Sequence, residues 1–206
     1  MRAEWLVAAF ACTQLAGCAA GPAIPTPRPA VERTGLLVPP GYGSLVQDEI
    51  TLTVRTEQVL LKVTPLEEWV LRLTAPDTHA RLSTLATTHR AEVVRRTGVA
   101  NPSLFLVSIF GRTPGATFRQ EDVHVLHRGR RLRPLLVREM TSGWGEGRVD
   151  TGGTQAAVFA FPEEIDFEQP ISVEYGAESG SAWEEILRRL EAERGRARGR
   201  AGLGPD

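Results

Sequence analysis

Cysteine is scarce in this 206-residue chain: Cys12 and Cys18 are the only two, and none follows Cys18. The rest of the chain therefore can form no disulfide and offers no thiolate to a metal or a substrate. A domain of about 150 residues needs no such support, because it buries around 70% of its unfolded surface on folding. We expect one domain held together by an ordinary hydrophobic core.

An excess of charge of either sign is also absent. The formal net charge is −1, which argues against a general nucleic-acid-binding protein. Lys62 is the only lysine, and arginine supplies the rest of the 24 basic residues; we interpret this bias as a consequence of GC-rich codons. No internal repeat is visible, and the apolar run near the N-terminus is shorter than the roughly 20 residues that a membrane-spanning helix requires.

Catalytic and metal-binding motifs are missing as well. The histidines His79, His89, His124 and His127 lack the His-Glu-x-x-His spacing of zinc sites. No serine occupies a Gly-x-Ser-x-Gly elbow. The glycine-rich stretch 143–147 is not followed by the Gly-Lys-Ser/Thr sequence of a phosphate-binding loop. We therefore expect no enzyme, no metal ion and no cofactor.

The N-terminus has the pattern of a secretion signal. Residues 5–17 are apolar apart from Thr13 and Gln14, Arg2 precedes them, and small residues follow, as in secretory signals. Two alternatives are a Cys12–Cys18 disulfide within this segment and an ordinary secreted protein cleaved after Ala20.

Residues 15–18, Leu-Ala-Gly-Cys, resemble the bacterial lipoprotein signal, in which small residues precede an invariant cysteine. The resemblance implies that residues 1–17 are removed and that the Cys18 thiol carries a diacylglyceryl group, with acyl chains such as palmitate. Several acyl chains, at about 0.8 kcal/mol per buried methylene, hold a protein on a membrane. Because Ala19 and not aspartate follows, the resemblance implies the periplasmic face of the outer membrane in a host with two membranes.

Residues 18–44 predict a tether, because they are rich in proline. Proline-rich segments favour an extended polyproline II conformation of about 3.1 Å per residue and act as semi-rigid spacers. The alternative is a disordered leader with no length requirement. The prolines concerned are Pro22, Pro25, Pro27, Pro29, Pro39 and Pro40.

Residues 45–194 predict a single β-rich domain. Apolar residues alternate with polar ones over 50–54 and again over 59–63 with opposite parity, so a turn or bulge is expected at 56–58. Residues 103–111 are apolar on both faces, as in a covered central strand. Further strand patterns cover 123–127 and 131–137, which read as a hairpin, and also 154–161 and 171–175.

Helices are predicted near 65–97 and 181–194. Thr64 with Glu67 has the spacing of a capping box, Pro65 suits a first helical position, and Pro76 should interrupt that helix. Ser181 with Glu184 has the same spacing before the last helix. Residues 195–206, a basic tail that alternates arginine with glycine and alanine over part of its length, are expected to be disordered.

Together these elements predict an α+β fold: an antiparallel β-sandwich-like domain with a helical insertion and a C-terminal helix. Residues 118–134, FRQEDVHVLHRGRRLRP, followed by GGTQAAVFAFP at 152–162, resemble immunoglobulin-like (telokin-like) domains of secreted bacterial proteins and lipoproteins. The resemblance implies an adhesion-like or interaction scaffold. The helical stretch 66–97 departs from such sandwiches.

Two features suggest contact with a partner. Trp144, in the glycine-rich stretch, either folds back over the core or is exposed as an interface anchor, a role that favours tryptophan. Four arginines cluster at the predicted hairpin and suit an anionic partner such as lipopolysaccharide or teichoic acid; the alternative is an ordinary solvated hairpin end. They are Arg128, Arg130, Arg131 and Arg133.

The sequence therefore predicts a lipid-anchored cell-envelope protein that acts as a structural or protein-interaction module. The alternative function is binding of an anionic glycan or lipid through the hairpin Arg128–Arg133. The membrane is contacted through the N-terminal lipid, an envelope protein is a candidate partner, and no nucleic acid is expected. Nothing in the sequence indicates the oligomeric state.

Overall fold

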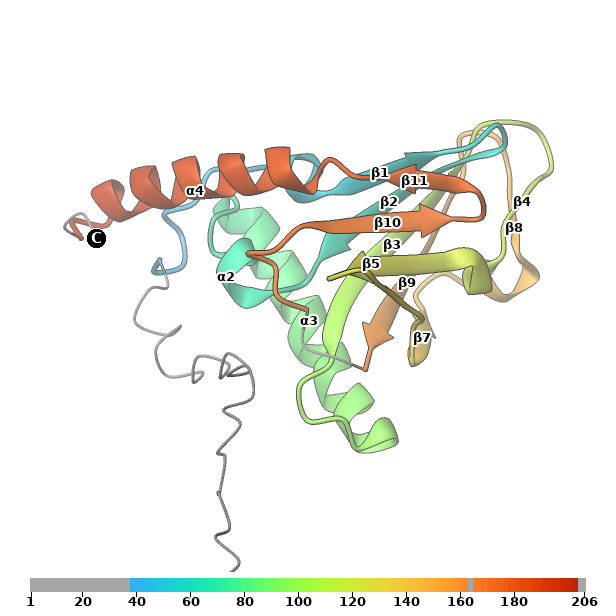
Figure 1. Ribbon diagram of the computed structural model, residues 1–206, viewed down its shortest axis with the longest axis horizontal. Coiled ribbons are helices and arrows are strands. Elements are labelled where there is room, and N and C mark those ends of the chain that lie inside the picture. Colours follow the sequence, from blue (N-terminus) through green and yellow to red (C-terminus); the bar gives the residue numbers. More distant parts are fainter. Residues whose placement is uncertain (1–37, 163–164, 204–206) are drawn as a thin grey trace, which may run out of the picture. The chain divides into compact units, whose positions relative to one another are not determined.

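The computed structural model describes residues 38–162 and 165–203. The predicted signal, the lipid attachment at Cys18 and most of the predicted tether lie outside these residues. The fold is α+β, as predicted, with antiparallel sheets arranged like a sandwich (Figure 1). Helices α2 (Glu68–Leu71) and α3 (Pro76–Thr97) are inserted between two strands, and helix α4 (Trp183–Arg200) ends the described part of the chain.

Two sheets contain most of the strands. The five-stranded sheet has the order β1 (Leu52–Arg55), β2 (Val59–Pro65), β3 (Ser103–Gly111), β9 (Thr154–Phe161) and β7 (Leu136–Glu139). The four-stranded sheet has the order β11 (Glu178–Gly180), β10 (Ile171–Tyr175), β5 (Val123–His127) and β6 (Arg130–Leu132). A short ribbon joins β4 (Ala116–Thr117) to β8 (Arg148–Val149). Every pairing between these strands is antiparallel.

The centre of the five-stranded sheet is β3, as its apolar pattern predicted. It pairs with β2 on one side and β9 on the other, and seven of its nine residues are buried. The predicted turn between β1 and β2 is confirmed: the Thr56 amide donates to the Val59 carbonyl at 2.9 Å. Alternate residues of β1 are buried and exposed, which is the period expected of a strand with one covered face.

The two sheets approach each other closely along one side. Gly180 of β11 lies against β1, and a Cβ atom at Gly180 would come within 2.4 Å of the Thr53 carbonyl oxygen. On the other side, β6 ends one sheet and β7 ends the other. The prediction of a single strand over 131–137 is therefore wrong. The segment is divided between β6 and β7 around Pro134, which has no amide hydrogen to donate within a sheet.

Thr64 does not cap a helix, which corrects the predicted capping box. Its hydroxyl lies 2.7 Å from the hydroxyl of Thr51, and Pro65 is the last residue of β2, paired with Phe105. The long-range pairing with β3 therefore prevails over the local capping signal. Helix α2 is a single turn that begins at Glu68.

Helix α3 follows its sequence signals. Pro76 is its first residue, and the helix ends at Gly98, whose φ of 73° is left-handed, as is common after the last turn of a helix. Glu92 forms an ion pair of 3.1 Å with Arg138 of β7. This contact places α3 against the five-stranded sheet.

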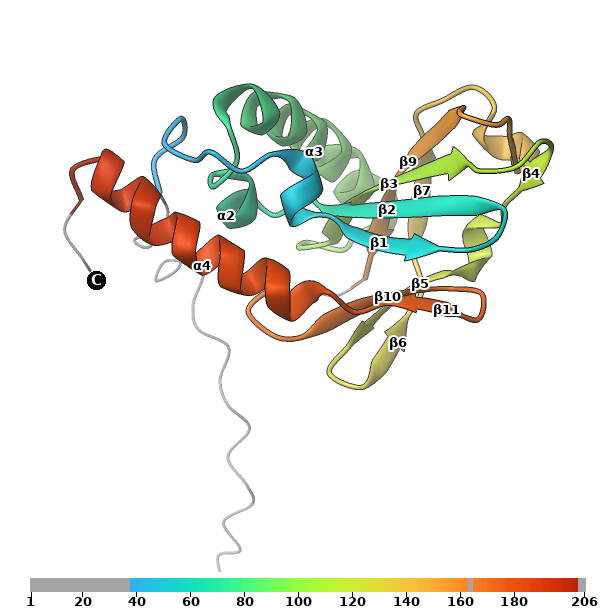
Figure 2. The same ribbon diagram turned by 90° about the horizontal axis from the view of Figure 1, so that it is seen from above.

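Helix α4 is longer than predicted, so residues 195–200 are helical and not a disordered tail. It begins beside β10 and β11 and runs away from the strands (Figure 2). Ala182 and not Ser181 precedes its first turn, and no side chain caps it. Ala197 is buried, and this tertiary packing stabilises a stretch whose glycines disfavour a helix.

A buried carboxylate joins α4 to the segment where the chain enters the body. Glu193 is fully buried; it accepts hydrogen bonds from the Ser44 hydroxyl at 2.8 Å and from Arg196 Nε at 2.8 Å, and it pairs with Arg200. Arg200 Nε also donates to the Tyr42 carbonyl at 2.8 Å. Residues 38–44 therefore pack on the body, which corrects the predicted tether boundary at 44.

An aromatic cluster anchors the other end of α4 in the core. Trp183 is fully buried and its Nε1 donates to the Phe167 carbonyl at 3.0 Å. Its ring lies 5.8 Å from that of Phe167, which in turn lies 5.5 Å from Phe105. Phe105 of β3 contacts Phe161 of β9 edge-to-face at 5.5 Å. The cluster thus links α4 to the two central strands.

Candidate binding pocket

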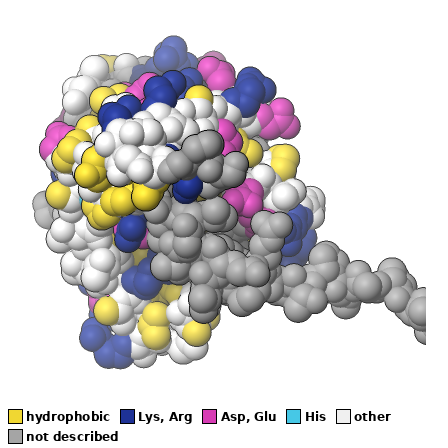
Figure 3. Space-filling view, turned by 90° about the vertical axis from the view of Figure 1, so that its left-hand side faces the viewer, with side chains coloured by type: hydrophobic (Ala, Val, Ile, Leu, Met, Phe, Trp, Pro, Cys, Tyr) yellow, Lys and Arg dark blue, Asp and Glu magenta, His cyan; other side chains and the backbone are white. Residues whose placement is uncertain are grey.

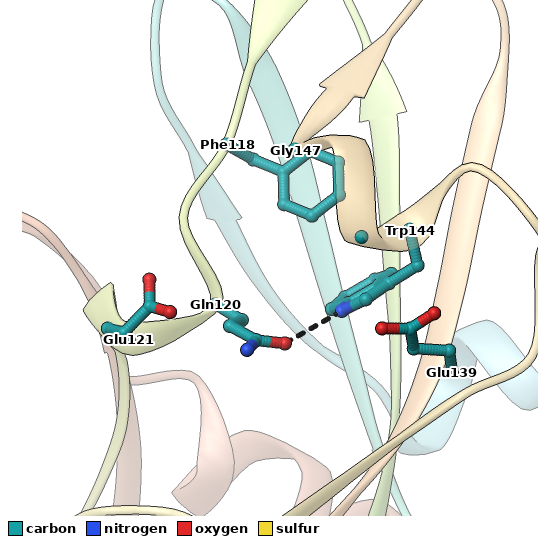
Figure 4. A pocket seen from close by; sticks show the side chains of 7 residues that line it. Phe118, Gln120, Glu121, Glu139, Trp144 and Gly147 are labelled. Carbon is teal, nitrogen blue, oxygen red and sulfur yellow. Dashed lines mark hydrogen bonds between the residues drawn. The ribbon is translucent and has the colours of Figure 1, made fainter.

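A pocket of about 240 Å³ lies at the end of β7 (Figure 4). Two parts of the chain that are distant in sequence build it: the stretch between β4 and β5, and the segment from Glu139, the last residue of β7, to Gly147 in the loop before β8. Its lining residues include Phe118, Gln120, Glu121, Glu139, Trp144 and Gly147.

Glycine shapes the loop that carries Trp144. The 3-10 turn η3 (Trp144–Glu146) ends at Gly147, whose φ of 63° is left-handed, a conformation that side chains with a Cβ rarely adopt. The Phe118 amide donates to the Gly147 carbonyl at 2.8 Å. A Cβ at Gly147 would come within 2.9 Å of the Phe118 carbonyl oxygen. The two strands of the β4–β8 ribbon can therefore approach only with glycine here.

Trp144 folds back over the core, so the alternative of an exposed interface anchor is wrong. Its side chain is 2% exposed, and its Nε1 donates to Gln120 Oε1 at 2.9 Å. Its ring lies 4.9 Å from Phe118 and 5.9 Å from Phe159. The indole is thus a fixed wall of the pocket, held by packing on both sides and by one hydrogen bond.

The rim of the pocket is acidic. Glu139 lies beside the indole, and Glu121 lies beyond Gln120 on the other side (Figure 4). Both are exposed. Arg119 Nε lies 4.0 Å from Glu121, whereas no ion pair joins Glu139 to another described residue. A Cβ at Gly145 would lie 3.4 Å from Glu139 Oε1, so this glycine lies beside the carboxylate.

The arginine hairpin forms as predicted. Arg128, with φ of 52°, and Gly129, with φ of 72°, make the tight turn between β5 and β6, since two left-handed residues match the twist of the strands. Arg128 pairs with Asp166 at 2.8 Å, and Arg131 pairs with Glu174 at 2.8 Å.

Neighbouring carboxylates therefore already offset part of the hairpin's charge. Arg130 and Arg133 are exposed. The hairpin and Trp144, both singled out in the sequence, contribute to different features: Trp144 forms the pocket wall, while none of the four arginines lines the pocket.

The histidines do not gather into a site. His124 is 4% exposed, with its Nδ1 3.1 Å from the Asp122 carbonyl oxygen and 3.3 Å from Arg131 Nη2. Burial lowers the pKa of His89, on α3. Within residues 38–162 and 165–203, no group of three or more histidine, cysteine, aspartate or glutamate side chains is placed to hold a metal ion.

Acidic and basic side chains are interspersed on the end of the body where α4 finishes (Figure 3). On α4 itself, Arg189 pairs with Glu185 at 3.1 Å and Arg194 with Glu191 at 3.2 Å. This face is therefore not uniformly basic. Among the described residues, no helix combines the length and apolar character that a membrane span requires.

Sequence reasoning identified one wall of the pocket and missed its rim. A tryptophan between glycines marked the loop that carries Trp144. Glu121 and Glu139 gave no signal of their own, because each is an ordinary surface acid. The position of Glu139 depends on the pairing of β7 with β9, and that of Glu121 depends on the connection between β4 and β5. In comparisons with known proteins, the chain matches no family model, no curated protein and no solved structure.

Proposed function

We propose that this protein is a lipid-anchored cell-envelope protein whose folded body serves as a protein-interaction module without catalytic activity. The observation that carries the proposal is the pocket at the end of β7. It brings two exposed carboxylates, Glu121 and Glu139, to the rim of a pocket whose geometry is fixed by the packing of Trp144. A preorganised site suits binding because little conformational freedom is lost.

The membrane assignment of this proposal depends on the sequence around Cys18. The Leu-Ala-Gly-Cys stretch supports a lipid on the cysteine, and the prolines that follow support a spacer between the lipid and residue 38, where the described body begins. In a host with two membranes, Ala19 supports the periplasmic face of the outer membrane.

Changing Cys18→Ala should release the protein from membranes almost completely, because the attached acyl chains supply the membrane affinity. The measurement is the fraction of protein that sediments with membranes from cells that express the full chain. Cys12→Ala is the matched control, since that cysteine lies within the predicted signal, and this variant should stay with the membranes. Sedimentation of Cys18→Ala to the same extent as the unchanged protein would refute the lipid anchor.

The interaction role predicts a stoichiometric partner. Isolation of the tethered protein from detergent-solubilised native membranes, followed by mass spectrometry, should recover an envelope protein that survives washing. The chain with Cys18→Ala, purified and added to the same extract, should retain that partner if the body makes the contact. Recovery of the protein alone in both experiments would contradict the proposal.

An anionic glycan or lipid as the ligand of the arginine hairpin is the second proposal. Arg133 is exposed, which favours it, whereas the ion pairs of Arg128 and Arg131 reduce the charge available. An empty isolation experiment would therefore shift attention to this hairpin.

A further inference from the structure

We infer that the end of α4, together with the segment where the chain enters the body, is a docking surface for anionic lipid headgroups. This inference rests on the proposed lipid anchor and specifies which face of the body contacts the membrane. Three observations support it: the arginines in the last turns of α4, two exposed apolar side chains beside them, and the place where the chain from Cys18 reaches the body. The α4-end surface, as we call it, consists of Tyr42, Arg196, Arg200 and Leu203.

The last turns of α4 are basic. Residues 191–203 contain four arginines and two glutamates, a net charge of +2, and residues 38–46 contain no charged side chain. Of the two acids, Glu193 is fully buried and Glu191 is paired with Arg194. Basic side chains are attracted to an anionic leaflet over distances up to a Debye length. The balance of charge at this end of the helix therefore favours an anionic partner.

Arg196 and Arg200 are held in place but are not enclosed. Both pair with Glu193, so one carboxylate lies between two guanidinium groups and a positive charge remains. Their side chains are 57% and 42% exposed. Because a guanidinium group presents several N–H donors in a planar fork, it can bind a lipid phosphate while it keeps its bond to the carboxylate.

Two large apolar side chains flank these arginines. Tyr42 is 39% exposed and Leu203 is 40% exposed, and the Leu203 amide donates to the Arg198 carbonyl at 3.0 Å, which holds Leu203 against the last turn. Hydrophobic and basic side chains lie side by side on this end of the body (Figure 3). Tyrosine is enriched at membrane–water interfaces, and apolar residues combined with basic ones are typical of surfaces that lie on membranes.

The path of the chain places the α4-end surface toward the membrane. The Arg200 Nε donates to the Tyr42 carbonyl at 2.8 Å, so the chain enters the body beside the end of α4. Cys18 and Val38 are 20 residues apart and hence at most about 70 Å apart, at about 3.5 Å per residue. A connection of this length keeps the surface at a high effective concentration near the lipid, so weak contacts suffice for docking.

Coupling the protein to vesicles through Cys18 tests this surface. The protein is the mature-length chain, residues 18–206, in which Cys18 is the only thiol. A maleimide lipid replaces the native anchor, so the result does not depend on lipidation in the cell. One set of vesicles is phosphatidylcholine, and the other also contains phosphatidylglycerol, which is anionic. The measured quantity is the rate at which the neutral reagent phenylglyoxal modifies each arginine, followed by mass spectrometry.

Arg196 and Arg200 should react at least about threefold more slowly on the anionic vesicles than on phosphatidylcholine, because bound headgroups cover them. High salt should remove this difference, since it screens exposed charges. Two arginines serve as internal controls and should react equally on both vesicles. Arg112 donates to the Thr56 carbonyl at the turn between β1 and β2, at the opposite end of the body from the end of α4 (Figure 1), and Arg133 lies on the hairpin.

Paired variants test the apolar part of the surface. Tyr42→Ser with Leu203→Ser removes both exposed apolar side chains but keeps the Tyr42 carbonyl that Arg200 binds. This double variant should lose at least about half of the protection at Arg196 and Arg200. Leu135→Ser with Met140→Ser is the matched control, because these side chains at the ends of β7 are exposed by a similar 43% and 45%; it should keep the protection. Circular dichroism checks that each variant is folded.

The outcomes separate this inference from the proposed function. Equal rates at Arg196 and Arg200 on the two kinds of vesicle would overturn the inference, whereas the lipid anchor is decided independently by membrane release of Cys18→Ala in cells. Slower reaction at Arg133 in place of Arg196 and Arg200 would also overturn it and would favour the hairpin as the lipid-binding site. Equal protection in the two double variants would exclude Tyr42 and Leu203 from the surface.

Discussion

Trp183→Ala is expected to lower the free energy of unfolding by about 3–5 kcal/mol, the range for deletion of a buried tryptophan side chain. Trp183 is the first residue of α4 and is fully buried. The change removes the contact with Phe167 and the hydrogen bond to its carbonyl. The resulting cavity opens beneath the start of α4, where surrounding strands cannot collapse to fill it.

Urea unfolding of the mature-length chain, followed by circular dichroism, measures this effect. Trp183→Phe separates the ring from the hydrogen bond: it keeps an aromatic ring beside Phe167, and we expect a smaller loss of about 1–2 kcal/mol from the missing donor. A loss below about 1 kcal/mol for Trp183→Ala would mean that the aromatic cluster does not anchor α4.

Glu193→Gln is expected to lower the free energy of unfolding by about 1–3 kcal/mol at pH 7. Burial raises the pKa of the Glu193 carboxyl, whereas the hydrogen bonds from Ser44, Arg196 and Arg200 lower it. The hydrogen bonds together have the larger effect, so the pKa of Glu193 is below its ordinary value. The effect stays below that of a fully buried ion pair because the side chains of Arg196 and Arg200 are 57% and 42% exposed and can be rehydrated.

The effect of Glu193→Gln should depend on pH in a defined direction. A carboxyl group whose pKa is lower in the folded state stabilises the fold above its unfolded pKa of about 4.3. This contribution is lost as pH falls through the folded-state pKa. The difference in free energy of unfolding between the variant and the unchanged protein should therefore have its largest value at pH 7 and decrease on acidification.

The measurement is urea unfolding of both proteins at a series of pH values from neutral to below the unfolded pKa. Glu191→Gln is the matched control on the same helix, since its pair with Arg194 is partly exposed and should contribute about 0–1 kcal/mol. A difference that widens toward low pH would contradict the proposed ionised state of Glu193.

Local patterns in the sequence predicted the elements that depend mainly on their own residues. Residues 103–111 are apolar apart from Ser103 and Ser108, and they form the central strand β3 with the same bounds. The turn between β5 and β6 follows from Gly129, which tolerates positive φ, although Arg128 also adopts it. The end of α3 at Gly98 follows from the left-handed conformation that glycine permits.

Long-range contacts account for the errors. The capping signal at Thr64 was locally sound, but the pairing of β2 with β3 continues through Pro65. The arginine- and glycine-rich stretch after residue 194 has weak helix propensity, yet burial of Glu193 and Ala197 continues the helix to Arg200. Similarly, the pocket rim depends on the register of β7 against β9, which no local pattern specifies.

The contacts of Glu193 and Arg200 also determine how mechanical force would enter the body. A pull on the N-terminal segment reaches the buried Val38 first, whose carbonyl accepts a hydrogen bond from Arg72, and then residues 43–45. There the amides of Ser44 and Leu45 both donate to the Leu73 carbonyl at 3.1 Å, and Gly43 lies so close to the same residue that a Cβ would come within 2.2 Å of its carbonyl carbon.

Because Ser44 also donates to Glu193 and Tyr42 accepts from Arg200, the pull is shared with α4 and with the connection between α2 and α3. These contacts must rupture before tension reaches β1. The two sheets, and the pocket at the end of β7, would therefore keep their geometry while the N-terminal end of the chain is under strain.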